Sequence, residues 1–206
     1  PLEFSSLRTP SLKRLAQNVF PDAYIEEWAD MGQITELPEE NYGHYGRKDY
    51  TKTIVLPSSV KKLPLRTMIN YTALENLNTE NIEEFADSCL AHTSNLKAIS
   101  FASAKVMKPE CLRGSGMVVE SFVAPNLEQL QENALLEAKV VRIANLGKIT
   151  TAPRGGTFYE SYGARSTLIG IVFPASVTTI DVYTLYEYTK LQYIVFLSDV
   201  PPSAAN

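Results

Sequence analysis

The feature that most constrains this chain is a spacing of apolar residues that recurs along its length. After Leu168, apolar side chains follow three, five, nine and twelve positions later, at Ile171, Phe173, Val177 and Ile180. The count then restarts at Leu191. One unit of this kind can bury almost none of its apolar face by itself. The fixed period therefore predicts a solenoid in which each coil packs on its neighbours.

The spacing rule places the coil starts at Phe4, Ile25, Thr51, Leu74, Leu96, Val119, Val140, Leu168 and Leu191. The mean period is about 23 residues, which is within the range of leucine-rich repeats. Residues three and five positions after a start point to one side of a short strand, and a proline at position six ends that strand. We therefore predict a right-handed, leucine-rich-repeat-like solenoid of about nine coils over residues 1–206 as a single domain. Each coil contributes one short β-strand to a parallel sheet, together with a few short helical turns.

A second, longer repeat spans several coils. The segment from Pro10 (PSLKRLAQNVF) aligns without a gap with the segment from Pro125 (PNLEQLQENAL), at a shift of 115 residues. TKTIVLPSSVKKL from Thr51 aligns with LIGIVFPASVTTI from Leu168 at a shift of 117. These matches predict a duplicated block, residues 4–95 and 119–206.

Composition excludes several classes of function. The chain has 206 residues, is 45% hydrophobic and carries a net charge of -4, without a run rich in Lys and Arg. We therefore expect no nucleic-acid partner. No apolar stretch reaches the roughly 18 residues of a membrane span, and no signal sequence is evident in this segment.

The residues that could carry chemistry are few. Cys89 and Cys111 both lie 15 residues after a coil start, so they should stack on adjacent coils. They could form a cross-coil disulfide, but parallel side chains suit that geometry poorly, and two buried thiols are the preferred interpretation.

His44 and His92 are predicted to be solvated loop residues without enough partners to hold a metal. No nucleophile or acid–base constellation is evident, so we predict no enzyme, no metal and no cofactor.

A copied loop is the strongest functional candidate. NYGHYGRK (41–48) matches FYESYGAR (158–165) at a shift of 117. Repeat proteins often place extra residues on their binding face, and tyrosine is common in binding surfaces. The alternative is that the tyrosines point inward, because repeat register usually decides burial. The candidate residues are Tyr42, Tyr45, Lys48, Tyr159, Tyr162 and Arg165.

The consensus L-x-x-I-x-[LF]-P-x-x-V-x-x-I, seen from Thr51 and from Leu168, resembles the BspA-like leucine-rich repeat family. That family is abundant in surface and secreted proteins of Bacteroides and related bacteria. The resemblance implies an adhesion or binding role in the extracellular space or on the outer cell surface, and it carries no catalytic residues.

Two functions follow as hypotheses. The first is a binding module for a protein, peptide or glycan, with an apolar strand face as its contact surface. The residues predicted to line that face include Val55, Val123, Val172 and Val195. The alternative is a structural spacer or self-associating scaffold.

Overall fold

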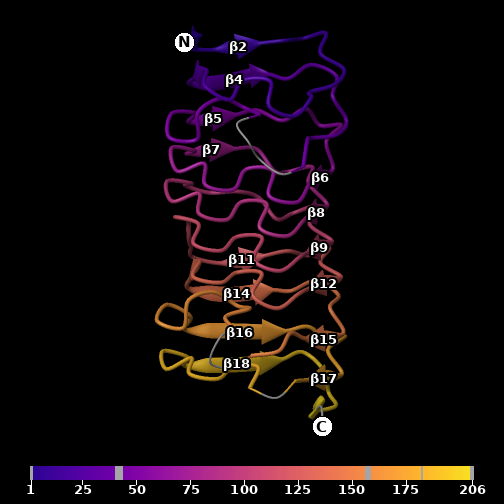
Figure 1. Cartoon of the computed structure of the whole chain (residues 1–206). Helices are drawn as coiled ribbons and strands as arrows, with labels where there is room; N and C mark the ends of the chain where they lie inside the picture. The colour runs from indigo at the N-terminus through magenta and orange to yellow at the C-terminus, as the bar shows by residue number, and fades with distance from the viewer. Residues whose placement is uncertain (1, 40–43, 156–158, 182, 205–206) are drawn as a thin grey trace.

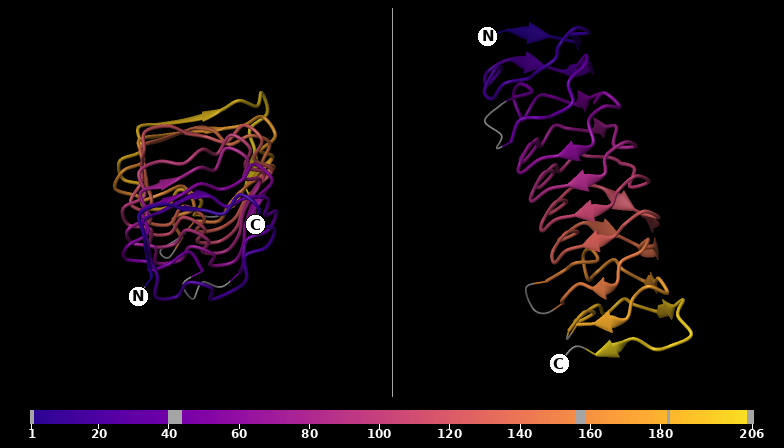
Figure 2. Two further views of the ribbon diagram at one scale, coloured as in Figure 1. Left: turned by 90° about the horizontal axis from the view of Figure 1, so that it is seen from above. Right: turned by 90° about the vertical axis from the view of Figure 1, so that its right-hand side faces the viewer.

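Successive coils of the chain stack into an elongated column, with the two termini at opposite ends (Figure 1). The structure is a computed structural model that describes residues 2–39, 44–155, 159–181 and 183–204. Seen down the stack, the coils lie over one another with a roughly rectangular outline (Figure 2). The predicted solenoid of period about 23 is confirmed, with about eight turns where nine coils were predicted.

One side of the column is a parallel sheet built from the first strand of each coil. Its two four-stranded parts have the orders β2-β4-β5-β7 and β11-β14-β16-β18, and an isolated bridge from Asn76 to Ala98 extends the first part. Side chains alternate along each strand, so the predicted inward residues enter the core. The strands are β2 (Leu7–Arg8), β4 (Glu27–Asp30), β5 (Thr53–Ile54), β7 (Asn76–Leu77), β11 (Phe122–Val123), β14 (Arg142–Asn145), β16 (Gly170–Phe173) and β18 (Tyr193–Phe196).

A second parallel ladder runs down the column beside the first (Figure 1), so the prediction of one strand per coil is wrong. The second apolar segment of each coil is extended, and its N–H groups find carbonyls on the neighbouring coil. The strands are β6 (Lys62–Leu63), β8 (Glu84–Phe85), β9 (Val106–Met107), β12 (Gln129–Leu130), β15 (Thr151–Ala152), β17 (Thr179–Ile180) and β19 (Ser203–Ala204). Two short pairs, β1 (Glu3–Phe4) with β3 (Tyr24–Ile25) and β10 (Val118–Val119) with β13 (Lys139–Val140), complete the sheets.

Turns, rather than the predicted helical segments, make the remaining side of each coil. Residues 65–70, 87–92, 109–114 and 132–137 are turns, and the described ranges contain no helix. Their backbone N–H groups bond to the next coil, as from Met68 to Cys89 O (2.9 Å) and from Leu90 to Cys111 O (2.9 Å). Those donors are therefore not available for an i to i−4 helix. Two residues with positive φ, four positions apart, recur in each of these turns: Arg66 and Asn70, Ser88 and His92, Glu110 and Gly114, Asn133 and Glu137.

The core is a continuous column of apolar side chains between these sides. The predicted inward residues Ile54, Ile171 and Phe173 are fully buried, as is the single tryptophan, Trp28. Burying a side chain of this size contributes roughly 1.5–3 kcal/mol, and here the buried surface lies between coils. Stability therefore comes from the contacts of each coil with its neighbours.

The two blocks repeat one turn in atomic detail. The Gly32 N–H bonds to the side chain of Asp30 and the Gly147 N–H to that of Asn145, both at 2.7 Å. Both glycines have positive φ, 69° and 64°. A Cβ on either would lie 2.4 Å from the backbone of the preceding coil, so only glycine fits. The shift between the two turns is 115 residues, as in the sequence alignment.

Candidate functional site

The outward side of β11, β14, β16 and β18 carries mostly small and apolar side chains, and we call it the platform face. Because strand side chains alternate, two outward positions per strand form two columns across the coils. The first column is Ser121, Arg142, Gly170 and Tyr193. The second is Val123, Ala144, Val172 and Val195, with a register shift between β11 and β14 that pairs Val123 with Asn145. Val123 is 45% exposed and Val195 39%, whereas Val172 is half-buried. The valines predicted at this position therefore do point outward.

A groove runs beside the second column of the platform face. It has a volume of about 450 Å³ and lies at the carboxyl ends of β14 and β16. Its single charged lining residue is Lys148. The lining is Pro125, Ala144, Asn145, Leu146, Gly147, Lys148, Val172, Pro174, Ala175, Ser176 and Leu197.

The ring of Tyr193 lies flat over Gly170, its partner in the β16–β18 register. A Cβ built on Gly170 would lie 1.9 Å from the Cζ atom of Tyr193, and 2.3 and 2.4 Å from its two Cε atoms. These three distances are nearly equal, as they are for a point above the ring at Cζ. If the Cβ lay in the plane of the ring instead, both Cε atoms would be much farther from it than Cζ is. The Cβ direction therefore meets the face of the ring, and since that direction is roughly perpendicular to the sheet, the ring is parallel to the sheet.

The same side of the first block is polar. Its first column is Ser6, Glu27, Thr53 and Asn76, and its second is Arg8, Ala29, Val55 and Asn78. Asn76 Nδ2 donates to Thr53 Oγ1 at 3.3 Å, and the side chain of Asn78 bonds to both backbone groups of Leu56. Val55 is the one large apolar side chain here, 38% exposed. The blocks therefore share their core positions but differ in the surface they present.

The copied loops place two of the candidate tyrosines in the core. Tyr45 and Tyr162 are both fully buried, so neither side chain is available to a ligand. This burial favours the interpretation that they point inward as part of the repeat. Burial also raises the pKa of both hydroxyls above the usual value for tyrosine. Tyr42 lies outside the described residues.

The remaining loop candidates are partly covered. Tyr159 is half-buried beneath the guanidinium of Arg154, which lies 5.2 Å from its ring centroid. Arg165 forms an ion pair of 2.6 Å with Glu187, and its side chain is 16% exposed. Lys48 is half-buried, and desolvation lowers its pKa. None of these residues lies on the platform face.

Two further tyrosines belong to the copied feature, and sequence reasoning missed them. The Tyr71 hydroxyl accepts the N–H of Tyr45 at 3.1 Å, and the Tyr188 hydroxyl accepts that of Tyr162 at 3.3 Å. Tyr71 and Tyr188 are themselves 117 residues apart. The signal was therefore present in the alignment at a shift of 117, but 26 residues after the loop tyrosines Tyr45 and Tyr162.

The prediction that His44 is solvated is wrong, because its side chain is fully buried. Its Nδ1 accepts the N–H of Asn18 at 2.9 Å, and its Nε2 lies 3.1 Å from Glu39 O. The imidazole therefore links the Asn18 backbone with that of Glu39. His92 is exposed, as predicted.

The two cysteines stack on adjacent coils as predicted, and both are free and fully buried. Cys89 Sγ lies 3.7 Å from Cys111 O, and Cys111 Sγ lies 3.4 Å from Ala134 O. Burial raises the pKa of each thiol well above its ordinary value. The thiols therefore act as small core residues in this structure.

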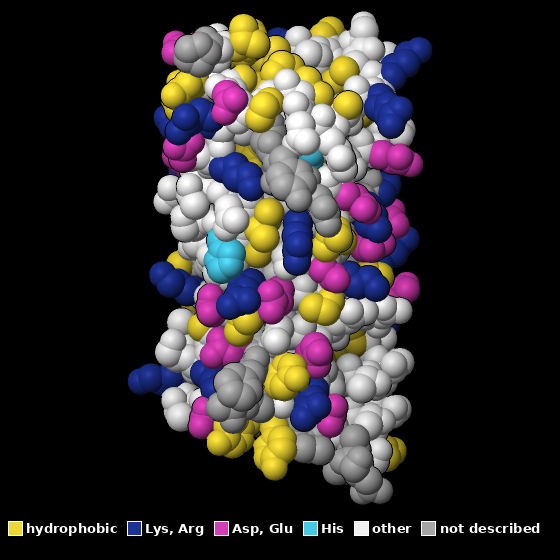
Figure 3. Space-filling model, viewed as in Figure 1, with side chains coloured by type: hydrophobic (Ala, Val, Ile, Leu, Met, Phe, Trp, Pro, Cys, Tyr) yellow, Lys and Arg dark blue, Asp and Glu magenta, His cyan; other side chains and the backbone are white. Residues whose placement is uncertain are grey.

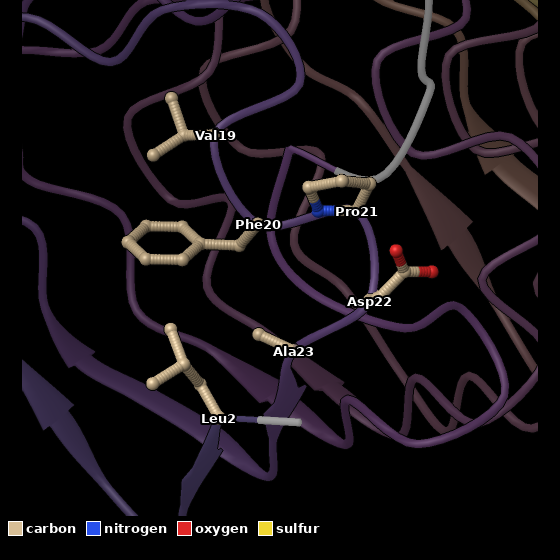
Figure 4. A pocket seen from close by; sticks show the side chains of 6 residues that line it. All are labelled: Leu2, Val19, Phe20, Pro21, Asp22 and Ala23. Atoms are coloured by element: carbon tan, nitrogen blue, oxygen red, sulfur yellow. The ribbon is translucent and has the colours of Figure 1, made fainter.

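Two further depressions lie away from the platform face. One, of about 480 Å³, is lined by Thr35, Glu36, Leu37, Glu39, Lys62 and Pro64. The other, of about 180 Å³ at the N-terminal end, is lined by Leu2, Val19, Phe20, Pro21, Asp22 and Ala23 (Figure 4). Acidic and basic side chains are interspersed over the face seen in Figure 3.

No group of three or more metal-ligating side chains occurs among the described residues. In the same ranges, no helix has the length and apolar character needed to cross a membrane.

Comparison with known proteins identifies the family. A family model described as a BspA type leucine-rich repeat region, in six copies, matches residues 13–142 and 119–202. No curated protein and no solved structure matches the chain. The matched ranges cover more than half of the sequence and contain the strands from β3 to β18. The chain belongs to the BspA-type leucine-rich repeat family.

Proposed function

We propose that this chain is a non-enzymatic binding module, on the cell surface or secreted, that recognises a protein, peptide or glycan through its platform face. The observation that carries the proposal is the difference between the two blocks. At the shifts of the alignment, Arg142, Gly170 and Tyr193 of the second block stand where the first block has Glu27, Thr53 and Asn76. The inward residue that follows each of them is apolar in both blocks. Contiguous exposed apolar surface on a soluble protein marks interaction sites. The family supports a surface repeat protein.

A charge placed on the platform face tests the proposal. Val123→Lys with Val195→Lys adds two cations at exposed positions that do not enter the core. Val55→Lys is the matched control, because it makes the same change on the first block. Wild type and variants are screened against an oligosaccharide array and a displayed peptide library. Binding that the double variant loses and the control keeps supports the proposal; equal binding by all three overturns it.

A structural scaffold is the second candidate, and the last strand of the first sheet favours it. Ile194 and Phe196 occupy inward positions of β18 but are 45% and 39% exposed. Such a surface can stack on a further coil of the same kind. Sedimentation over a concentration series tests this function. A Phe196→Ser variant that abolishes self-association would support it, and a wild-type monomer at all concentrations would rule out self-association.

A further inference from the structure

The pair formed by Gly170 and Tyr193 points to the chemistry of the ligand. One face of the Tyr193 ring rests on the Gly170 backbone, so the opposite face is directed away from the sheet. The side chain is 41% exposed. We infer that Tyr193 is a stacking platform for a sugar ring, and that the ligand of the platform face is a glycan. This inference rests on the proposed function and makes it specific.

The fold does not require glycine at position 170. Gly170 is the first residue of β16 and pairs with Arg142 on one side and Tyr193 on the other, and it is not among the glycines with positive φ. Glycine is unfavourable in a paired strand. What it provides is space, because any Cβ there would overlap the Tyr193 ring. A glycine inside a strand often marks a place where another group approaches closely. Here that group is an aromatic ring held parallel to the sheet.

The first block shows the arrangement that the repeat adopts without a platform. At a shift of 117 residues, Thr53 replaces Gly170 and Asn76 replaces Tyr193. These two polar side chains bond to each other at 3.3 Å, and the strands pair in the same register. The coil therefore folds with either pair. The exposed ring and the glycine beneath it are a property of the second block's surface.

A flat, supported ring suits a sugar better than a peptide side chain. The C–H bonds on one face of a pyranose are weakly positive, and the face of an aromatic ring is negative, so the two stack. A peptide anchor usually enters a pocket, but the position beneath this ring is filled by the Gly170 backbone. The exposed face of the Tyr193 ring is flat, like one face of a pyranose, and it contains no pocket for a peptide side chain.

Polar groups near the platform supply hydrogen bonds to hydroxyl groups. Arg142 is the next outward residue of the same column, paired with Gly170 in the sheet. Its Nε donates to Glu120 O at 3.2 Å, and its two Nη groups have no partner in the described ranges. The groove that begins at Val172 adds Asn145, Lys148 and Ser176. Its volume of about 450 Å³ accommodates further sugar units along a chain.

The decisive variant copies the first block onto the second. Gly170→Thr with Tyr193→Asn recreates a pair that this chain already folds with, so its thermal midpoint should stay close to that of the wild type. Tyr193→Phe keeps the ring face, and Asn76→Ala is the matched control on the first block. The probe is a printed array of microbial and mammalian oligosaccharides. The strongest hit is then titrated by calorimetry and examined by saturation-transfer NMR.

We expect the pair exchange to weaken glycan binding by about tenfold or more, a loss of about 1.4 kcal/mol. Tyr193→Phe and Asn76→Ala should bind within about twofold of the wild type, and sugar ring protons should receive saturation from the Tyr193 ring. Glycan binding that survives the pair exchange overturns the inference. So does a peptide ligand that the double lysine variant loses while no glycan binds, although the proposed function then stands. If no ligand depends on the platform face, both fail.

Discussion

The Tyr71 hydroxyl accepts the main-chain N–H of Tyr45 at 3.1 Å and donates to Gly46 O at 3.1 Å. One buried side chain thereby satisfies two backbone groups of the first long loop. The second block repeats the arrangement, because Tyr188 accepts the N–H of Tyr162 and donates to Gly163 O at 3.1 Å. The loops are irregular in the repeat, and these tyrosines replace the hydrogen bonds that a ladder would supply.

Tyr71→Phe and Tyr188→Phe should each destabilise the protein by about 2 kcal/mol or more, because each leaves a buried N–H and a buried C=O without a partner. Urea unfolding followed by circular dichroism measures both. Tyr50→Phe is the control, since Tyr50 lies at the surface and should change stability by less than about 0.5 kcal/mol. Equal stabilities for all three variants would contradict the proposed role of these hydroxyls.

The two loop tyrosines should respond differently to loss of the hydroxyl. Thr67 Oγ1 donates its hydrogen to Pro38 O at 3.0 Å, so Tyr45 is the donor in its 2.9 Å bond to Thr67. The buried Tyr162 hydroxyl has no hydrogen-bond partner within the described residues. Tyr45→Phe should therefore cost about 1 kcal/mol, whereas Tyr162→Phe should be neutral or stabilising. Matched urea titrations test this order, and a larger loss for Tyr162→Phe would refute it.

Alkaline pH should destabilise the fold in two stages. Burial raises the pKa of both thiols above 9.0 and that of Tyr45, Tyr162 and Tyr188 above 10.0. The unfolded chain therefore loses these protons first, and stability falls as pH rises through the unfolded pKa values. The free energy of unfolding should decline from about pH 9 and more steeply above pH 10. Cys89→Ala with Cys111→Ala should remove the first stage and leave the second.

Charges alternate from coil to coil beside the first sheet. Lys52 pairs with Glu26 at 2.9 Å, and Lys97 pairs with Glu75 at 2.5 Å, with Glu75 on the coil after Lys52. The hydrogen bond to Glu26 raises the pKa of Lys52. Lys52→Glu places three carboxylates on successive coils, so the urea midpoint should fall at low salt. High salt screens these exposed charges and should restore most of the difference. A midpoint loss that does not depend on salt would point to a steric cause.

Sequence reasoning located the core because the apolar spacing is a local property. Ile54, Ile171 and Phe173 follow the three-and-five rule, and all are buried. The spacing rule does not indicate which groups accept the hydrogen bonds of the backbone N–H groups. It therefore missed the second strand ladder and expected helical turns, where N–H groups such as that of Met68 bond to the next coil. His44 was misjudged for the same reason, because its partner Asn18 lies 26 residues earlier.

The sequence by itself determined the solenoid, its period and the inward positions, since all of these follow from spacings within one coil. The tertiary structure decided which residues meet across coils. Only stacking brings Tyr71 to the Tyr45 backbone and places the Tyr193 ring over Gly170, because each pair is separated by a full coil of chain. Contacts across coils depend on the side chains of two coils at once, whereas the repeat pattern describes one coil at a time.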